Sequence, residues 1–83
     1  MDPQKNDLTE QEELKILGEI LEAYVDTPIK KDAFLISDLG LDSFLIVYFI
    51  SEVDDRFGVT IEMPEHVEYM TVQDVLDQLN QKN

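Results

Sequence analysis

Apolar residues recur at helical spacing in the first third of the chain. The positions that carry this pattern are Leu14, Leu17, Leu21 and Tyr24, with Ile20 and Val25 beside them. Intervals of three and four residues place such side chains on one face of an α-helix. Thr9 stands three residues before Glu12, the arrangement of a capping box at a helix start. The pattern predicts a first helix from Glu10 to Val25.

A long connection follows this helix. Residues 26–42 contain Pro28 and show neither a helical period nor a sustained alternation. Connections of this length in a small domain are commonly functional or packed by their own side chains. We expect the apolar triplet at 34–36 to pin the connection to the core. At its end, Gly40 permits a sharp turn, and either Asp42 or Ser43 can cap a new helix.

The most apolar run of the chain, residues 44–50, consists of residue types that favour strands. We nevertheless predict a helix here, because a cap precedes the run and Val53 and Phe57 extend its apolar face at helical spacing. Gly58 supplies the C-terminal stop.

Seven apolar residues in succession cover nearly two helical turns, so one amphipathic interface cannot bury all of them. The members of the run that we assign to the core are Phe44, Val47 and Ile50. We expect Leu45 and either Tyr48 or Phe49 to be exposed.

The last third of the chain predicts two more helices. Residues 59–61 form a short extended link, and Pro64 suits the first turn of a brief third helix that ends near Tyr69. Thr71 then caps a final helix. Its apolar face consists of Val72, Val75, Leu76 and Leu79. The predicted fold is therefore all-α, a small four-helix bundle with a long loop between helices one and two and a short third helix.

This pattern predicts one domain over residues 9–80, after a flexible leader at 1–8 and before a frayed tail at 81–83. Nineteen acidic against six basic residues give a net charge of −13, which repels nucleic acid and favours basic protein partners. The hydrophobic share of 43% is too high for a disordered acidic tail. With no cysteine, disulfides and thiolate metal sites are excluded. The polar start and the short apolar runs predict a soluble, cytoplasmic protein without a membrane span, and we expect a monomer.

Three short motifs stand at spaced positions in the chain. Taken alone, Ser43 is most simply a helix cap. However, the run Asp38-Leu39-Gly40-Leu41-Asp42-Ser43-Phe44 resembles the D-L-G-x-D-S-L signature of acyl carrier proteins. Phe57-Gly58-Val59-Thr60-Ile61 is similar to the family's F-G-(V/I)-x-I segment, and Thr71-Val72-Gln73-Asp74 to its T-V-x-D start of the last helix. Three motifs in register across residues 10–80 make the resemblance specific.

The resemblance implies that Ser43 receives 4′-phosphopantetheine from coenzyme A, while Asp42 helps to hold magnesium and coenzyme A during loading. It also implies a core that opens to take an acyl chain and a carrier without catalysis of its own. Its cargo would be acyl intermediates, held as thioesters, in fatty-acid or polyketide-like synthesis. Its partners would be a phosphopantetheinyl transferase, acyl synthases or ketosynthases, and acyltransferases. The residues are consistent with this role. A helix N-terminus favours a phosphate, and a chain without cysteine can carry a thioester only on a thiol supplied by a prosthetic group.

The sequence departs from the family pattern after the serine. Many fatty-acid carriers have Leu next and acidic residues two and five positions beyond the serine, whereas this chain has Phe44, Leu45 and Tyr48. We hypothesise that a partner docks here through hydrophobic contact, with Leu45 as the exposed residue.

The resemblance also implies that acidic residues meet basic groups of partner enzymes. The candidates are Glu52, Asp55, Glu62 and Glu65. A merely solvated face is the alternative reading of these charges. A strongly acidic carrier would also meet basic partners faster at low salt.

The sequence leaves two alternative functions open and argues against two kinds of site. An aminoacyl or peptidyl carrier is one alternative, although such carriers usually show G-G-(D/H)-S, and a helical interaction module that is never loaded is another. A serine hydrolase would pair Ser43 with His66, but the G-x-S-x-G elbow is missing and His66 is expected on the third helix, partly exposed. A calcium loop fails on spacing, because counting from Asp38 puts Phe49 at the twelfth position, so no metal site is expected.

Overall fold

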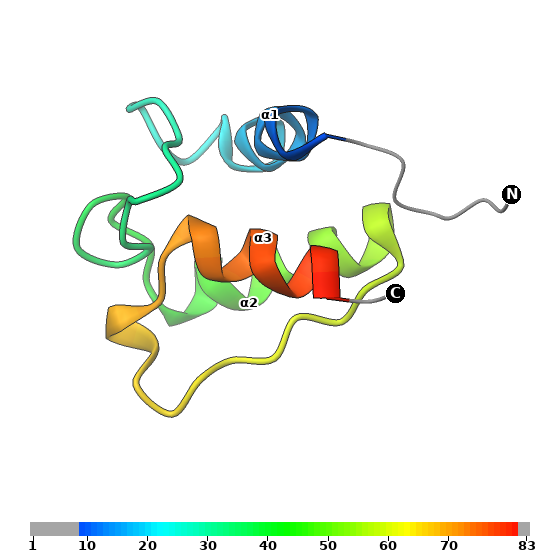
Figure 1. Ribbon diagram of the computed structural model, residues 1–83. Helices are drawn as coiled ribbons and strands as arrows, with labels where there is room; N and C mark the ends of the chain where they lie inside the picture. Colours follow the sequence, from blue (N-terminus) through cyan, green and yellow to red (C-terminus); the bar gives the residue numbers. More distant parts are fainter. Residues whose placement is uncertain (1–8, 82–83) are drawn as a thin grey trace, which may run out of the picture.

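The chain is described by a computed structural model over residues 9–81. It contains the α-helices α1 (Glu10–Leu21), α2 (Ser43–Phe57) and α3 (Val72–Gln81), with a short 3₁₀-helix, η1 (Val67–Tyr69), before α3 (Figure 1). Between residues 9 and 81 there is no β-strand, so the all-α prediction is confirmed. The predicted leader, 1–8, and the last two residues of the predicted tail lie outside the described residues.

The start of α1 is the predicted capping box. The N–H of Thr9 donates to Glu12 Oε1 at 2.9 Å, and the N–H of Glu12 donates to Thr9 Oγ1 at 3.1 Å. The helix ends at Leu21 instead of the predicted Val25, and the following residues form a turn. Valine, aspartate, threonine and proline at 25–28 are poor helix formers, and the proline disfavours helical backbone before it.

The connection from 22 to 42 is tied to the core and to the start of α3. Leu35 is fully buried, as the sequence predicted for its triplet, and its N–H donates to the carbonyl of Met70 at 3.0 Å. The N–H of Val72 donates to the carbonyl of Ala33 at 3.0 Å. These bonds hold the long connection in place without a helix of its own.

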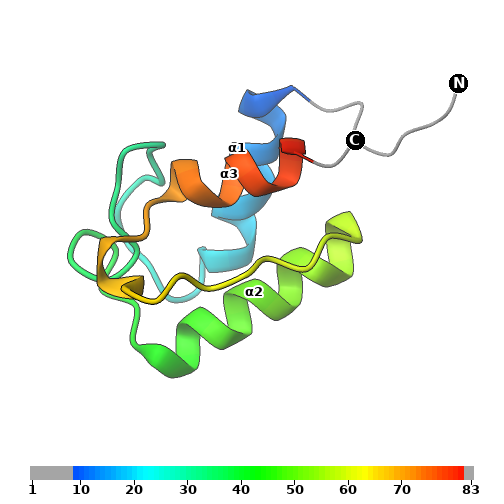
Figure 2. The same cartoon turned by 60° about the horizontal axis from the view of Figure 1, so that its bottom comes forward.

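Helix α2 begins after Asp42 and ends at Gly58, whose φ of 70° is the left-handed conformation expected of a C-terminal glycine. In Figure 1, α1 lies above α2 and α3, and it contacts both of them. Figure 2 shows the connection from α2 to η1 running back alongside α2. Ser43 therefore sits at the end of α2 that is reached from the long first connection.

The predicted third helix is not an α-helix, and the four-helix count is not confirmed. Residues 59–64 have no regular structure, and only one 3₁₀ turn forms at Val67–Tyr69. Before this turn, the N–H of Glu62 donates to Gln78 Oε1 at 2.8 Å, and Gln78 Nε2 donates to the carbonyl of Glu62 at 2.9 Å. A 3₁₀ turn also matches the inward spacing of three residues between half-buried Val67 and buried Met70.

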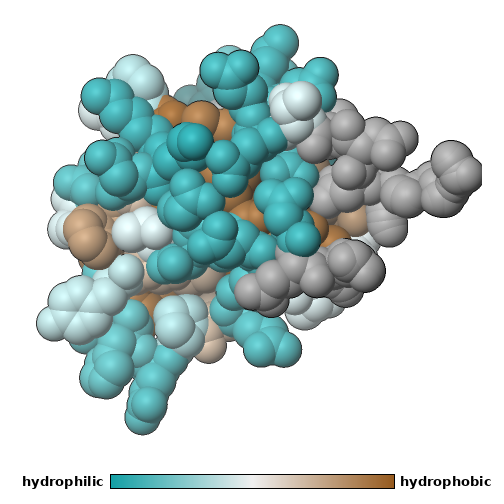
Figure 3. Space-filling model, viewed as in Figure 1, coloured by the Kyte–Doolittle hydropathy of each residue, from teal (hydrophilic) through white to brown (hydrophobic). Residues whose placement is uncertain are grey.

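The core lies between the three α-helices and the long connection. The predicted apolar face of the last helix is confirmed, since Val72, Val75, Leu76 and Leu79 are fully buried. Glu13 is buried as well, and its Oε1 accepts a hydrogen bond from Asn80 Nδ2 at 3.1 Å. Figure 3 shows hydrophilic residues over most of the face seen in Figure 1, with hydrophobic residues visible between them. A membrane-crossing helix needs a longer apolar run than any helix within residues 9–81 provides.

Candidate functional site

The start of α2 presents a serine hydroxyl to solvent. Asp42 is the N-cap, because its Oδ1 accepts a hydrogen bond from the N–H of Leu45 at 2.9 Å and its carbonyl accepts one from Ile46 at 2.9 Å. Of the two capping residues that the sequence left open, the structure therefore uses Asp42. Ser43 is the first residue of the helix, is exposed, and its hydroxyl has no hydrogen bond to any part of the chain that the structure describes.

Backbone amides at this helix end are free. An α-helix leaves its first N–H groups without partners inside the helix. Leu45 and Ile46 bond to Asp42, whereas the N–H groups of Ser43 and Phe44 have no acceptor within residues 9–81. These two amides and the helix dipole make the end of α2 favourable for an anion.

The distribution of carboxylates sets α2 apart from the other described helices. Acidic residues occupy the first turns of α1, η1 and α3, namely Glu10, Glu12, Glu13, Glu68 and Asp74. The first turn of α2 has none. In a chain of net charge −13, an anion at Ser43 meets only the capping carboxylate of Asp42 in its immediate helix turn.

The approach to the site is a tight turn. Gly40 has a φ of 74°, a conformation that other residues adopt only with strain. The N–H of Gly40 donates to the carbonyl of Ile36 at 3.0 Å, and that of Leu41 donates to Leu35 at 3.1 Å. Leu41 is buried, so this turn delivers Asp42 to the helix start in a defined position.

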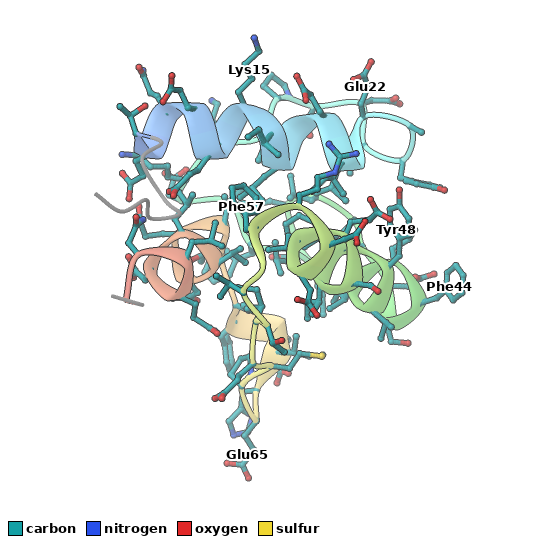
Figure 4. All side chains as sticks on the ribbon, turned by 90° about the vertical axis from the view of Figure 1, so that its right-hand side faces the viewer. Lys15, Glu22, Phe44, Tyr48, Phe57 and Glu65 are labelled. Atoms are coloured by element: carbon teal, nitrogen blue, oxygen red, sulfur yellow. The ribbon has the colours of Figure 1, made fainter. Side chains whose placement is uncertain are left out.

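The predicted exposure of the apolar run on α2 was wrong at several positions. Phe44 is 78% exposed and Val47 is 60% exposed, although both were assigned to the core. Leu45, expected to be exposed, is half-buried against the core. Figure 4 shows Phe44 projecting outward from the first turn of α2.

The reason lies in the rotation of the helix. The buried stripe of α2 consists of Ile46, Phe49 and Val53. With 3.6 residues per turn, Phe44 and Val47 fall on the opposite side of the helix from this stripe. Ile50 and Leu45 lie at its edges and are half-buried. Tyr48 points away from the stripe and is half-buried, with its ring against that of Tyr24. Phe49 is fully buried, so the prediction that Tyr48 or Phe49 is exposed was wrong as well.

Tyr48 contacts the turn that follows α1. Its ring lies 5.4 Å from that of Tyr24, measured between centroids, in an edge-on arrangement of 68°. Phe44 lies one turn before Tyr48 on α2, as Figure 4 shows. The predicted partner residues Phe44, Leu45 and Tyr48 thus differ in exposure, and Phe44 is the one that projects.

The predicted acidic residues do not form one face. Glu52 Oε1 lies 3.6 Å from Arg56 Nε on the same helix, so the charge of Glu52 is partly paired. Asp55, on the same helix, is exposed. Glu62 belongs to the connection after α2, and Figure 4 shows Glu65 at the outer end of that connection, away from Phe44. Glu52 and Asp55 share α2 with Ser43, whereas Glu62 and Glu65 do not.

His66 is exposed, and its Nδ1 lies 3.6 Å from Glu68 Oε2. No hydrogen bond joins it to Ser43 in the part of the chain that the structure describes. Within the same residues, no cluster of three or more His, Asp or Glu side chains is arranged to hold a metal ion.

An open hollow beside α2 was not predicted from the sequence. It has a volume of about 480 Å³ and is lined by Val47, Ile50, Ser51, Asp54, Ile61 and Met63. The exposure of Val47 could have been found by projecting the run onto a helical wheel around Ile46, Phe49 and Val53. Met63 lies in an irregular connection, where periodicity carries no signal.

Comparison with known families adds one match. The model for the phosphopantetheine attachment site matches residues 14–79, which include all of α2 together with Asp42 and Ser43. A comparison with solved structures found no match.

Proposed function

Because the chain belongs to the family of phosphopantetheine attachment domains, we propose that it is an acyl carrier whose prosthetic group is joined to Ser43 Oγ. A 4′-phosphopantetheine group supplies a terminal thiol on a flexible arm. This chain contains no cysteine, so a thioester cargo requires that imported thiol.

The observation that carries the proposal is the exposed hydroxyl of Ser43 at a helix start with free amides and no acidic side chain in its first turn. In the loading reaction, Ser43 Oγ forms a bond to the phosphorus next to the pantetheine. The pyrophosphate linkage of coenzyme A breaks, adenosine 3′,5′-bisphosphate leaves, and the hydroxyl proton passes to the transferase. The phosphodiester would be an anion at the start of α2, and the unbonded N–H groups of Ser43 and Phe44 are donors that could bind it.

The residues around Ser43 fit this role. Asp42 caps the first turn of α2, and buried Leu41 before it anchors the helix start, while Ser43 itself is exposed. We assign Asp42 a second task, to help hold magnesium and coenzyme A during loading. Catalysis by the chain itself is not part of the proposal, because no basic side chain among the described residues bonds to Ser43.

The proposed cargo is an acyl intermediate of fatty-acid or polyketide-like synthesis. Support comes from the D-L-G-x-D-S run at 38–43, since aminoacyl and peptidyl carriers usually have G-G-(D/H)-S. The proposed partners are a phosphopantetheinyl transferase, synthases and acyltransferases with basic or partly apolar docking patches.

The test is a loading assay read by intact mass. Apo protein is incubated with coenzyme A, magnesium and a broad-specificity phosphopantetheinyl transferase. We expect the wild type to gain the mass of one phosphopantetheine group and Ser43→Ala to gain nothing. Ser37→Ala and Ser51→Ala are matched controls, because both serines are also exposed, and both variants should load like the wild type.

Absence of a mass gain in the folded wild type would overturn the proposal and favour an interaction module that is never loaded. A gain that persists in Ser43→Ala would place the group on another residue. For the cargo, the decisive measurement is the mass of the thioester on protein purified from its native cell.

A further inference from the structure

We propose that Met63 is a site of reversible oxidation by hydrogen peroxide, where one added oxygen makes the walls of two surface hollows more polar. Met63 lies in the irregular connection between α2 and η1. The proposal does not depend on the loading of Ser43. It rests on the exposure of the thioether, on its position in the two hollows and on the way the neighbouring backbone is held.

The two methionines within residues 9–81 differ in exposure. Met63 is 44% exposed, whereas Met70 is 1% exposed. Access to the sulfur atom governs how fast peroxide oxidises a thioether. Pro64 follows Met63, and a residue before proline is disfavoured from helical backbone, which agrees with the lack of regular structure at 59–64. Of these two methionines, Met63 is therefore the one that peroxide reaches in the folded chain.

Met63 lines two hollows at once. The hollow beside α2 has a volume of about 480 Å³, and its other apolar lining residues are Val47, Ile50 and Ile61. A second hollow, of about 430 Å³, is formed between the same connection and α3, where Met70 and Gln78 also line it. Because the Met63 side chain is common to both hollows, a change in its polarity changes both of them.

The oxidation step balances with hydrogen peroxide as the only co-reactant. A lone pair of the Met63 sulfur forms a bond to one oxygen of the peroxide, the O–O bond breaks, and the other oxygen leaves as hydroxide. The hydroxide takes the proton from the oxygen on sulfur and becomes water, so the sulfur is oxidised and the peroxide is reduced. The product is a sulfoxide, a polar group in place of an apolar thioether. Sulfoxide reductases reverse this change, which makes the site a switch.

The backbone next to Met63 is held without the Met63 side chain. The N–H and the carbonyl of Glu62 both bond to the side-chain amide of Gln78, at 2.8 and 2.9 Å. Ile61 is 3% exposed and belongs to the core. A polar group on Met63 therefore changes the surface of the connection while these contacts stay in place. A sulfoxide on Met70 would instead place a polar group in the core.

The test treats the full chain with hydrogen peroxide and locates the added oxygen by peptide mass spectrometry. Because a buried sulfur reacts only when the structure opens, Met63 should react at least about tenfold faster than Met70. Met63→Leu keeps an apolar side chain of similar size and should lose the fast addition at this position. Met70→Leu is the matched control, in which Met63 should react at the wild-type rate. Sulfoxide reductases for both sulfoxide epimers should then remove the oxygen.

Two further measurements test where the oxygen lies and whether the fold tolerates it. The methyl NMR signals of Val47 and Ile61 should shift on oxidation, whereas those of Leu17, which is buried and lines neither hollow, should not. The urea midpoint of unfolding should change by less than about 0.5 M, as expected for a change at an exposed side chain.

Several outcomes would overturn the proposal. Equal rates for Met63 and Met70 would show that exposure does not select the site. Equal methyl shifts at Leu17 and Val47, or a large fall in the urea midpoint, would mean that oxidation damages the fold. An oxygen that the reductases cannot remove would exclude a reversible switch. Circular dichroism identifies a variant that does not fold, and the comparison of Met63 with Met70 in the wild type then decides.

Discussion

The hydrogen bond from the N–H of Leu45 to Asp42 Oδ1, at 2.9 Å, predicts how much the cap contributes to stability. Asp42→Ala removes this bond, which typically costs ~1 kcal/mol, and also a negative charge at a helix N-terminus, worth about 0.3–1 kcal/mol. The expected loss is about 1–2 kcal/mol. Asp42→Asn keeps an oxygen that can accept the bond and loses only the charge, so its expected loss is about 0.3–1 kcal/mol.

These losses are measurable because a domain of 83 residues has a stability of only about 4–12 kcal/mol. Urea unfolding followed by circular dichroism is the assay. If the free energy of unfolding falls by about 1 kcal/mol per molar urea, the urea midpoint should fall by about 1–2 M for Asp42→Ala and by less than about 1 M for Asp42→Asn. An unchanged midpoint for Asp42→Ala, or equal losses for both variants, would refute the capping account.

The same pair of variants separates the cap from the proposed loading role. Asp42→Asn should fold almost as stably as the wild type, yet it should load poorly if the carboxylate helps to hold magnesium. The loading rate at saturating coenzyme A is the measurement. Normal loading of Asp42→Asn would limit Asp42 to the helix cap.

Three further predictions follow from the packing and the backbone. Phe49→Ala should lower the free energy of unfolding by about 3–5 kcal/mol, because Phe49 is fully buried, whereas Phe44→Ala should change it by less than about 0.5 kcal/mol; equal losses in urea unfolding would contradict this assignment. Gly58→Ala should cost about 1–2 kcal/mol, since its φ of 70° strains an L-residue although no atom lies within 4 Å of an added Cβ, and Gly58→Asn should cost less. The hydrogen bonds from Gln73 and then Lys31 lower the pKa of Glu10 below its ordinary value of 4.5, so the stability that this carboxylate contributes is present above pH 4.5 and is lost as the pH falls through the lowered pKa. The stability difference between the wild type and Glu10→Gln should therefore shrink only below pH 4.5, and a difference that changes near neutral pH would exclude this cause.

Local sequence signals predicted the start of α1, the end of α2 and the buried face of α3. Thr9 and Glu12 form a capping box from their own side chains, and Gly58 stops α2 by its own backbone preference, so neither depends on distant contacts. Val72 and Leu79 follow a period that a single buried face imposes, and both are fully buried. Such features can be read from a window of a few residues.

The predictions that were wrong concern features that tertiary contacts determine. Apolar character alone could not say which side of α2 faces the core, and Phe44 and Val47 were assigned to the wrong side. Gln78 bonds the backbone of Glu62 from sixteen residues away and ties the irregular connection before η1 to α3, a contact that leaves no mark in the local sequence. The motifs were enough to propose Ser43 as the attachment residue, whereas the exposure of its neighbours depends on how α2 is rotated against the core.

The two free N–H groups at Ser43 and Phe44 have a consequence for backbone hydrogen exchange. An amide without an acceptor exchanges with solvent nearly as fast as in an unfolded chain, while amides deeper in a helix are protected. In the unmodified protein, these two amides should exchange fast although they belong to α2. A phosphodiester that rests on the helix end would accept bonds from them and slow their exchange, whereas one that extends into solvent would not. The exchange rates of these two adjacent amides therefore report whether the start of the arm lies against the helix end or extends into solvent.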